Sequence, residues 1–223
     1  MKNVKAIIFD AYGTLFDVSS AAKKCKDKIG DKWEVFANYW RTTQLEYTWL
    51  RSLMKRHKDF WQVTEDSLDK SMKAYKIDSS MKDELLDLYK ILSPFKEVPE
   101  VLKTLKEKNL KLAILSNGTP ALLNQLVKSN NLENLFDDLF SIEEVRIYKP
   151  DSKVYDMPTK KYQIQKNEVA FLSANTWDVS GAGNYGYNSI WLNRNNNIFD
   201  NLDYEPKLEI KNLQDLLPNI ESN

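Results

Sequence analysis

The residues best suited to chemistry lie at the end of the first apolar run. Residues 6–9 lead directly to Asp10, in a turn that contains Gly13 and Thr14. A carboxylate at a strand end, with glycine three residues later, can accept backbone N–H bonds that keep it ionised and aim a lone pair at a substrate. Asp10 is therefore a candidate nucleophile. The same pattern also fits a capped turn without catalytic use, so the choice depends on the rest of the chain.

Two later apolar runs also end in polar residues. The segments are Ser116-Asn117 after residues 110–115, and Ser173-Ala174-Asn175 after residues 169–172. Ligands of parallel α/β sheets sit beyond the carboxyl ends of the strands. We therefore expect these polar side chains to gather with Asp10 at one edge of a sheet.

The runs that position these residues alternate with helical patterns. Buried strands are expected at residues 110–115, 169–172 and 189–192. Helices are expected to begin at Pro99 and after Pro120, where apolar residues recur at helical spacing. This alternation predicts an α/β fold: a doubly wound, right-handed parallel sheet with helices on both faces.

Residues 17–93 differ in composition from the rest of the chain, because they are rich in aromatic and charged residues at spacings of three and four. This spacing indicates amphipathic helices. We expect residues 17–93 to form a helical cap inserted into a core domain of residues 1–16 and 94–223. Most of the cap aromatics should pack in its interior. Arg41 follows Tyr39 and Trp40, where an unpaired guanidinium is costly to bury, so it should pair with an acid or await an anion.

Composition excludes several classes of protein. Lys+Arg and Asp+Glu both number 32, and a zero formal charge argues against a nucleic-acid-binding protein. The basic run at residues 55–58 is expected to be a solvated helix face, with the single histidine, His57, at the surface. The only cysteine, Cys25, cannot form an internal disulfide. Without a leader pattern or an apolar stretch of about 18 residues, we expect a soluble cytoplasmic protein that makes no membrane contact.

Four short motifs occur in order along the chain. They are residues 10–14 (Asp-Ala-Tyr-Gly-Thr), 115–118 (Leu-Ser-Asn-Gly), 148–150 (Tyr-Lys-Pro) and 173–178 (Ser-Ala-Asn-Thr-Trp-Asp). Together they resemble the haloacid dehalogenase superfamily. Arg41 and the residues at 144–146 and 153–155 narrow the resemblance to its type II L-2-haloacid dehalogenase branch, and it spans nearly the whole chain.

This resemblance implies hydrolytic dehalogenation of short L-2-haloacids to D-2-hydroxy acids with inversion. Asp10 attacks C2 of the substrate from behind and forms an ester intermediate. The family resemblance also implies a homodimer whose partners in the reaction are only a small 2-haloacid and the released halide.

The resemblance also assigns roles to residues of this chain. The catalytic set is Asp10, Thr14, Arg41, Lys149, Asn175 and Asp178. The set that binds substrate and halide is Ala11, Tyr12, Arg41, Ser116, Asn117, Tyr155, Ser173 and Trp177. Thr14 and Lys149 hold Asp10 in place, and Asp178 positions the hydrolytic water with Asn175 and Lys149. Asp178 could alternatively be a helix N-cap.

The halide cradle implied by the resemblance consists of Arg41, Asn117 and Trp177, whose cation, amide donor and aromatic edge stabilise developing negative charge. Ser116 corresponds to the residue that binds the substrate carboxylate. Simpler alternatives are plain packing for Trp177, turn hydrogen bonds for Ser116 and an exposed side chain for Lys149.

Two positions bear on metal use, because most members of the superfamily are magnesium-dependent phosphatases. The phosphatases carry a second aspartate where this chain has Tyr12, and a metal-binding acid where it has Ala174. A departing halide needs no proton, and Asp10 and Asp178 alone would hold a hard cation poorly. We therefore expect metal-free catalysis without a cofactor.

Three other functions remain as alternatives to dehalogenation. They are a magnesium-dependent phosphatase, a non-catalytic binding protein with this fold, and an enzyme that opens strained cyclic amino acids.

Three further features carry expectations. Pro158 should end or kink a helix that begins near Ser152, which bears on the geometry around Tyr155. Gly181 and Ala182 are small, so the last helix should pack close to the sheet. A dehalogenase of the α/β-hydrolase type is excluded, because the chain has no suitably placed histidine and no Gly-x-Ser-x-Gly elbow.

Overall fold

The computed structural model describes residues 1 and 3–220, and its centre is a six-stranded sheet. All the pairings are parallel, and the strand order is β3-β2-β1-β4-β5-β6. The strands are β1 (Ala6–Phe9), β2 (Lys111–Ser116), β3 (Asp138–Ser141), β4 (Val169–Ser173), β5 (Asn188–Leu192) and β6 (Leu208–Ile210). The predicted doubly wound parallel sheet is confirmed. The strands β3 and β6 were not predicted, because each is a short outer strand with few apolar residues.

The central position of β1 explains why Asp10 matters. Phe9 pairs with Ile114 of β2 on one side and with Leu172 of β4 on the other. The residues that follow these three strands therefore meet at one edge of the sheet, where the order of the strands changes direction.

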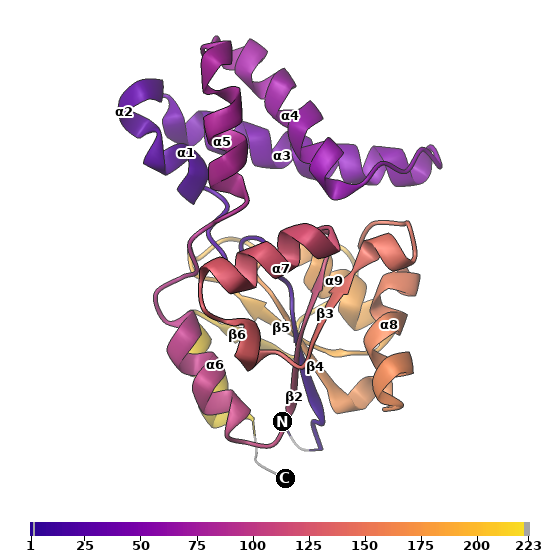
Figure 1. The fold of residues 1–223 in the computed structure, drawn as a ribbon. Helices are drawn as coiled ribbons and strands as arrows, with labels where there is room; N and C mark the ends of the chain where they lie inside the picture. The colour runs from indigo at the N-terminus through magenta and orange to yellow at the C-terminus, as the bar shows by residue number, and fades with distance from the viewer. Residues whose placement is uncertain (2, 221–223) are drawn as a thin grey trace.

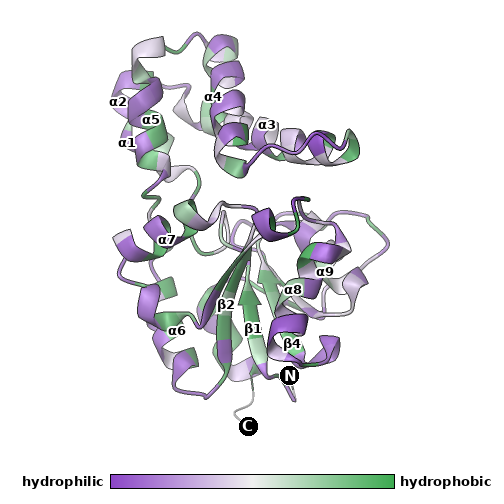
Figure 2. Cartoon of the chain, turned by 45° about the vertical axis from the view of Figure 1, so that its right-hand side comes forward, coloured by the Kyte–Doolittle hydropathy of each residue, from purple (hydrophilic) through white to green (hydrophobic). Residues whose placement is uncertain are grey.

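Helices flank the sheet on either side of its strongly apolar strands (Figure 2). The core helices are α6 (Val98–Lys106), α7 (Pro120–Ser129), α8 (Ser152–Tyr162) and α9 (Thr176–Tyr185). The short 3-10 helices are η1 (Ser79–Met81), η2 (Glu133–Leu135), η3 (Ile142–Glu144), η4 (Lys166–Glu168) and η5 (Leu213–Asn219). Pro99 and Pro120 each lie in the first turn of their helix, as expected. Thr119 caps α7 by accepting a hydrogen bond from the Leu122 N–H at 3.2 Å.

Pro158 does not end its helix, because α8 continues to Tyr162, and the kink that was the other expectation stays a prediction. Val154, Tyr155 and Met157 are buried on the inner face of α8. Their packing holds the helix on both sides of the proline and outweighs the hydrogen bond that proline cannot donate.

Five helices between β1 and α6 in sequence form a separate layer beside the carboxyl ends of the strands (Figure 1). These cap helices are α1 (Ser20–Lys24), α2 (Lys26–Ile29), α3 (Trp33–Leu53), α4 (Phe60–Tyr75) and α5 (Lys82–Tyr89). Phe36, Trp40 and Phe60 are buried among them. Among the described residues, no helix combines the length and apolar character required to cross a bilayer.

Two chain segments that run side by side join the cap helices to the core. The Asp17 N–H donates to the Ser93 carbonyl at 2.9 Å, and the Phe95 N–H donates to the Leu15 carbonyl at 3.0 Å. A bridge between Phe16 and Pro94 lies between these two bonds. The connection therefore has the hydrogen bonding of a short β-ladder.

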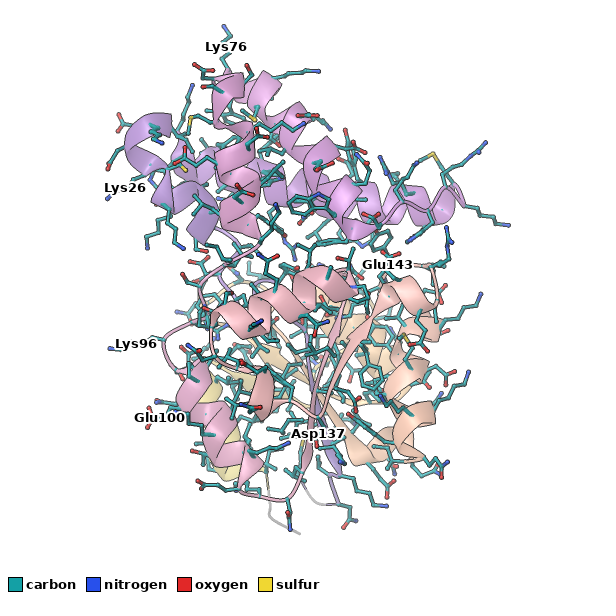
Figure 3. The ribbon with its side chains drawn as sticks, in the orientation of Figure 1. Lys26, Lys76, Lys96, Glu100, Asp137 and Glu143 are labelled. Carbon is teal, nitrogen blue, oxygen red and sulfur yellow. The ribbon has the colours of Figure 1, made fainter. Side chains whose placement is uncertain are left out.

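The basic run at residues 55–58 is not a helix face, because it lies in the turn and loop between α3 and α4. His57 is also not a free surface residue: its side chain is 14% exposed, and its Nε2 lies 2.9 Å from Glu143 Oε2. Glu143 lies on the side of the core that faces the cap helices (Figure 3). The sequence could not predict this contact, since it joins the loop between α3 and α4 to the 3-10 helix η3, and the two residues are 86 positions apart.

Candidate active site

Asp10 lies just beyond β1, is 5% exposed and accepts hydrogen bonds on both carboxylate oxygens. Its Oδ2 accepts from Thr14 Oγ1 at 2.8 Å, from Asn175 Nδ2 at 2.9 Å and more weakly from Ser173 Oγ at 3.4 Å. Its Oδ1 accepts from Lys149 Nζ at 3.1 Å. Among the described residues these donors are side chains, so the backbone N–H donors expected from the sequence are not the ones used.

The turn after β1 brings Thr14 back to the carboxylate. Gly13 has a φ of 88°, a conformation that residues with a Cβ rarely adopt. Thr14 Oγ1 also accepts from the Ala174 N–H at 2.9 Å. The hydroxyl is therefore fixed between the turns that follow β1 and β4.

Lys149 bridges two carboxylates and is fully buried. Its Nζ lies 3.1 Å from Asp10 Oδ1 and 2.9 Å from Asp178 Oδ2, and its side chain is 0% exposed. The alternative of an exposed lysine is wrong. Burial alone would lower the pKa of Lys149, but the two carboxylates raise it above its ordinary value, so the ammonium stays charged.

Asp178 lies in the first turn of α9, where Asn175 occupies the N-cap position, so the N-cap alternative for Asp178 is wrong. Burial raises the pKa of Asp178 to about 6, while Lys149 lowers it and Asp10 raises it further. This value places the carboxylate close to neutral pH, in the range useful for a general base.

Tyr155 of α8 holds the Asp178 carboxylate through a hydrogen bond. Its hydroxyl donates to Asp178 Oδ1 at 2.7 Å. Burial, and then the charge of Asp178, raise the pKa of Tyr155 well above its ordinary value, so the hydroxyl keeps its proton. Gly181 allows this approach, since a Cβ there would lie 2.6 Å from the Tyr155 hydroxyl. The close packing at Gly181 is thus against Tyr155 of α8 and Pro150, and the expected role of Gly181 in packing α9 against the sheet stays a prediction.

Arg41 reaches the site from α3 of the cap. Its Nη2 donates to the Tyr12 carbonyl at 3.3 Å, and Asn175 Nδ2 donates to the same oxygen at 3.3 Å. This shared acceptor places the guanidinium beside the Asp10 network. Within the described residues Arg41 contacts neutral acceptors and forms no ion pair with an acid, so its charge is available to an anion.

Gln44 was not predicted from the sequence, although it orients Arg41. Its Oε1 accepts from Arg41 Nη1 at 2.9 Å, and its Nε2 donates to Thr64 Oγ1 at 2.7 Å and to the Tyr89 hydroxyl at 3.0 Å. Gln44 is buried. The sequence feature that could have indicated this role is the position of Gln44, three residues after Arg41 in a helix rich in aromatic residues.

The remaining predicted residues surround this network. Ser116 Oγ accepts from the Gly118 N–H at 3.1 Å, and Asn117 Oδ1 accepts from the Lys149 N–H at 3.1 Å. The Asn117 amide N–H₂ is therefore the group left to contact a ligand. Ala11 and Tyr12 are buried, and the Tyr12 ring stacks on Tyr89 at 5.7 Å.

Trp177 lies at the boundary between core and cap. Its ring packs edge-to-face on Trp49 of α3, with centroids 5.4 Å apart. This ring contact with a cap tryptophan supports the packing role and leaves the halide contact as a prediction.

The donor set does not fit a divalent cation. The Asp10 and Asp178 carboxylates are joined by the Lys149 ammonium, which occupies the space between them. Ala174 supplies no side-chain oxygen at the position of the phosphatases' acid. Within the described residues, no group of three His, Cys, Asp or Glu side chains could hold a metal. Magnesium requires about six oxygen ligands in octahedral geometry.

Comparison with known proteins decides the family. Residues 4–186 match the model of the haloacid dehalogenase-like hydrolases. The chain belongs to this family. The (S)-2-haloacid dehalogenase of Pseudomonas sp. (strain YL) is 40% identical over 216 residues, which cover 96% of this chain and 93% of the relative.

Solved structures agree with this placement. A dehalogenase with 36% identity superposes with a TM-score of 0.97 over 100% of both chains. The L-2-haloacid dehalogenase from Xanthobacter autotrophicus, solved with chloropropionic acid covalently bound, has 31% identity and a TM-score of 0.88 over 96% of both chains. Within the family this chain is an enzyme of the L-2-haloacid dehalogenase group, which confirms the resemblance noted in the sequence.

Proposed function

We propose that this enzyme hydrolyses short L-2-haloacids to D-2-hydroxy acids with inversion at C2, through an ester on Asp10. The observation that carries the proposal is the asymmetric anchoring of the Asp10 carboxylate. Oδ2 has three side-chain donors, whereas Oδ1 accepts only from Lys149 among the described residues. Oδ1 therefore keeps a lone pair for attack. The relative solved with chloropropionic acid covalently bound supports an ester intermediate.

In the first step Asp10 Oδ1 attacks C2 from the side opposite the halogen. The new C–O bond forms as the carbon–halogen bond breaks, and the halide leaves with the bonding electrons. Alignment of a fixed carboxylate with C2 can lower the activation free energy by about 7–11 kcal/mol. Arg41, Asn117 and Trp177 stabilise the departing halide.

In the second step a water attacks the ester carbonyl of Asp10 and gives a proton to Asp178. The bond between this carbonyl carbon and the oxygen attached to C2 then breaks. The D-2-hydroxy acid leaves with that oxygen, which takes the proton from Asp178, and Asp10 releases its remaining proton to solvent as its carboxylate is restored. Asn175 and Lys149 position this water. Esterification removes the negative charge of Asp10, and that charge raises the pKa of Asp178 in the free enzyme. Asp178 is therefore a carboxylate over a wider pH range in the intermediate than in the free enzyme.

The substrate is held by residues around the two carboxylates. Ser116 binds the substrate carboxylate, and Ala11, Tyr12 and Ser173 form the walls around C2. Tyr155 acts through Asp178, whose carboxylate it holds. The larger residue frequent at position 11 in this branch is an alanine here, which adds space near C2.

We assign residues 17–93 to the cap and residues 1–16 and 94–223 to the core. The cap carries Arg41 and closes over Asp10, which excludes bulk water during the first step. The working form proposed is a cytoplasmic homodimer, as the family resemblance implies.

Single turnover in heavy-oxygen water tests the ester. With enzyme in excess over L-2-chloropropionate, the first product takes its new oxygen from Asp10 and carries no heavy label. Heavy label in that product would refute the ester.

Steady-state halide release tests the substrate and the metal. L-2-chloropropionate should be turned over equally with and without a chelator, the D enantiomer should not react, and Asp10→Asn should be inactive. Turnover that is lost on chelation, or equal use of both enantiomers, would contradict the proposal.

A further inference from the structure

A phenylalanine ring lies against the buried ammonium of the active site. Lys149 Nζ is 5.1 Å from the centre of the Phe171 ring, and Phe171 belongs to β4, two residues before Ser173. Both side chains are fully buried. The face of an aromatic ring attracts a cation within about 6 Å, and the attraction is strongest where water is excluded. The ring is therefore a neutral partner of the Lys149 charge, in addition to the two carboxylates.

Two tyrosines hold the Phe171 ring in this position. The Tyr155 ring stands at 87° to it, with centroids 5.7 Å apart, and the Tyr187 ring stacks on it at 29° and 6.2 Å. Phe171 thus contacts both Lys149 and Tyr155. These are the two side chains that bind the Asp178 carboxylate, at 2.9 Å and 2.7 Å.

The ring contact differs from the two ion pairs of Lys149, because esterification does not remove it. In the free enzyme the ammonium pairs with Asp10 at 3.1 Å and with Asp178 at 2.9 Å. An ester on Asp10 carries no charge, so the buried ammonium then keeps the Asp178 carboxylate and loses the other. Loss of that partner favours release of the Lys149 proton or a shift of the ammonium toward Asp178.

We propose that Phe171 is a positioning residue for ester hydrolysis, whose ring keeps the Lys149 ammonium in place while Asp10 is esterified. This inference rests on the proposed ester. Phe171 acts through Lys149, which positions the water, and through Tyr155, which holds Asp178. The attack by Asp10 comes earlier, when both ion pairs of Lys149 are intact, so that step depends little on the ring.

Fluorination of the ring tests the proposal with little change in the shape of the side chain. Phenylalanine with one, two or three fluorine atoms on its ring replaces Phe171, introduced by a suppressor tRNA. Each fluorine withdraws electrons from the ring face and weakens its attraction for a cation. The ester formed from L-2-chloropropionate is followed in a single turnover by acid quenching and by the mass of the intact protein.

The rate constant of ester hydrolysis should fall stepwise with the number of fluorine atoms. The total loss should be about 3- to 30-fold, which corresponds to about 0.7–2 kcal/mol of lost attraction. By contrast, kcat/KM should stay within about twofold of the wild-type value, because it reports the steps up to the irreversible departure of the halide. A loss of packing alone would lower both constants.

Phe140 is the matched control, because its ring has the same kinds of neighbour away from the Asp10 network. Lys161 Nζ lies 5.6 Å from the centre of the Phe140 ring, and the Tyr162 ring stands at 80° to it at 5.8 Å. Phe140 is also buried in a strand of the same sheet, β3. Enzyme with fluorinated Phe140 should hydrolyse the ester at the wild-type rate.

Three results would overturn the proposal. The first is a hydrolysis rate constant that fluorination of Phe171 leaves unchanged. The second is an equal fall in the hydrolysis rate constant and in kcat/KM, which would assign Phe171 to packing. The third is the same loss in the Phe140 series. Failure of the proposed function is distinguishable, because then the wild-type protein itself would never gain the mass of the ester.

Discussion

The contact between Gln44 and Arg41 gives the sharpest test of how the cap contributes to catalysis. Gln44→Met keeps the length of the side chain but removes the acceptor that Arg41 Nη1 uses at 2.9 Å. A hydrogen bond to a charged group contributes about 1.5–3 kcal/mol, so full loss of Arg41 alignment lowers kcat/KM by about 10- to 100-fold. The guanidinium keeps its bond to the Tyr12 carbonyl, which makes the lower half of this range the expected result.

The same change also affects stability, and the two effects can be separated. Gln44→Met removes the amide that contacts the buried Tyr89 hydroxyl at 3.0 Å, which costs about 1–3 kcal/mol of unfolding free energy. Adding Tyr89→Phe removes the hydroxyl that has lost its amide partner and recovers part of that stability without restoring the acceptor for Arg41. The double variant should therefore unfold at higher urea than Gln44→Met but be at least as impaired in kcat/KM, because the Tyr89 hydroxyl is also a hydrogen-bond partner of Arg41.

The assay is halide release from L-2-chloropropionate, with competitive inhibition by bromide as a second measure of the anion site. Thr48→Val is the control, because Thr48 is buried on the same helix and its hydroxyl bonds only the Leu45 carbonyl among the described residues, at 2.6 Å. It should retain kcat/KM and bromide inhibition near the wild-type values. Unchanged bromide inhibition in Gln44→Met, or recovery of activity together with stability in the double variant, would refute the positioning of Arg41 by Gln44.

Three further predictions concern Asp178 and its neighbours. Because Asp178 acts in the second step, after the halide has left, its protonation should appear in kcat rather than in kcat/KM. At acid pH kcat should fall about tenfold per pH unit, with a midpoint below the pKa of about 6 that burial gives Asp178 in the free enzyme, because the ester removes the Asp10 charge. The raised pKa also affects stability. Below the ordinary pKa of 3.8 this carboxyl contributes its full amount to the free energy of unfolding, and that contribution is lost as the pH rises through about 6. Urea titrations at several pH values measure this change. Gly181→Ala should destabilise the fold by about 1–3 kcal/mol, because its Cβ would lie 2.6 Å from the Tyr155 hydroxyl and from Pro150 Cβ. It should also shift the acid limb of the pH profile, and an unshifted limb would show that Tyr155 does not tune Asp178.

Much of the fold could be predicted because its signals are local. The strands around Asp10 are apolar runs, and Pro99 and Pro120 mark helix starts through their own geometry. The signals failed where tertiary packing decided the outcome. Pro158 stays inside α8 because buried neighbours hold the helix, and the short outer strands β3 and β6 depend on their partner strands.

The site was partly predictable for a related reason. The type of each reactive residue and its place after a strand are written in the sequence, which sufficed to bring Asp10, Lys149 and Asp178 into one hypothesis. That hypothesis left open whether Lys149 is exposed and whether Asp178 is a helix N-cap. These questions concern burial and distance, which residue order does not encode.

The sequence by itself determined which reactive groups are present: a strand-end carboxylate, a second acid, a lysine and a cap arginine. These groups follow one another along the chain as they do in one family. Only the tertiary structure decided that one buried ammonium joins both acids, that Gln44 holds Arg41, and that His57 contacts the core. The physical reason is that pKa values and side-chain alignment depend on desolvation and on contacts between distant segments, and both exist only after the chain has folded.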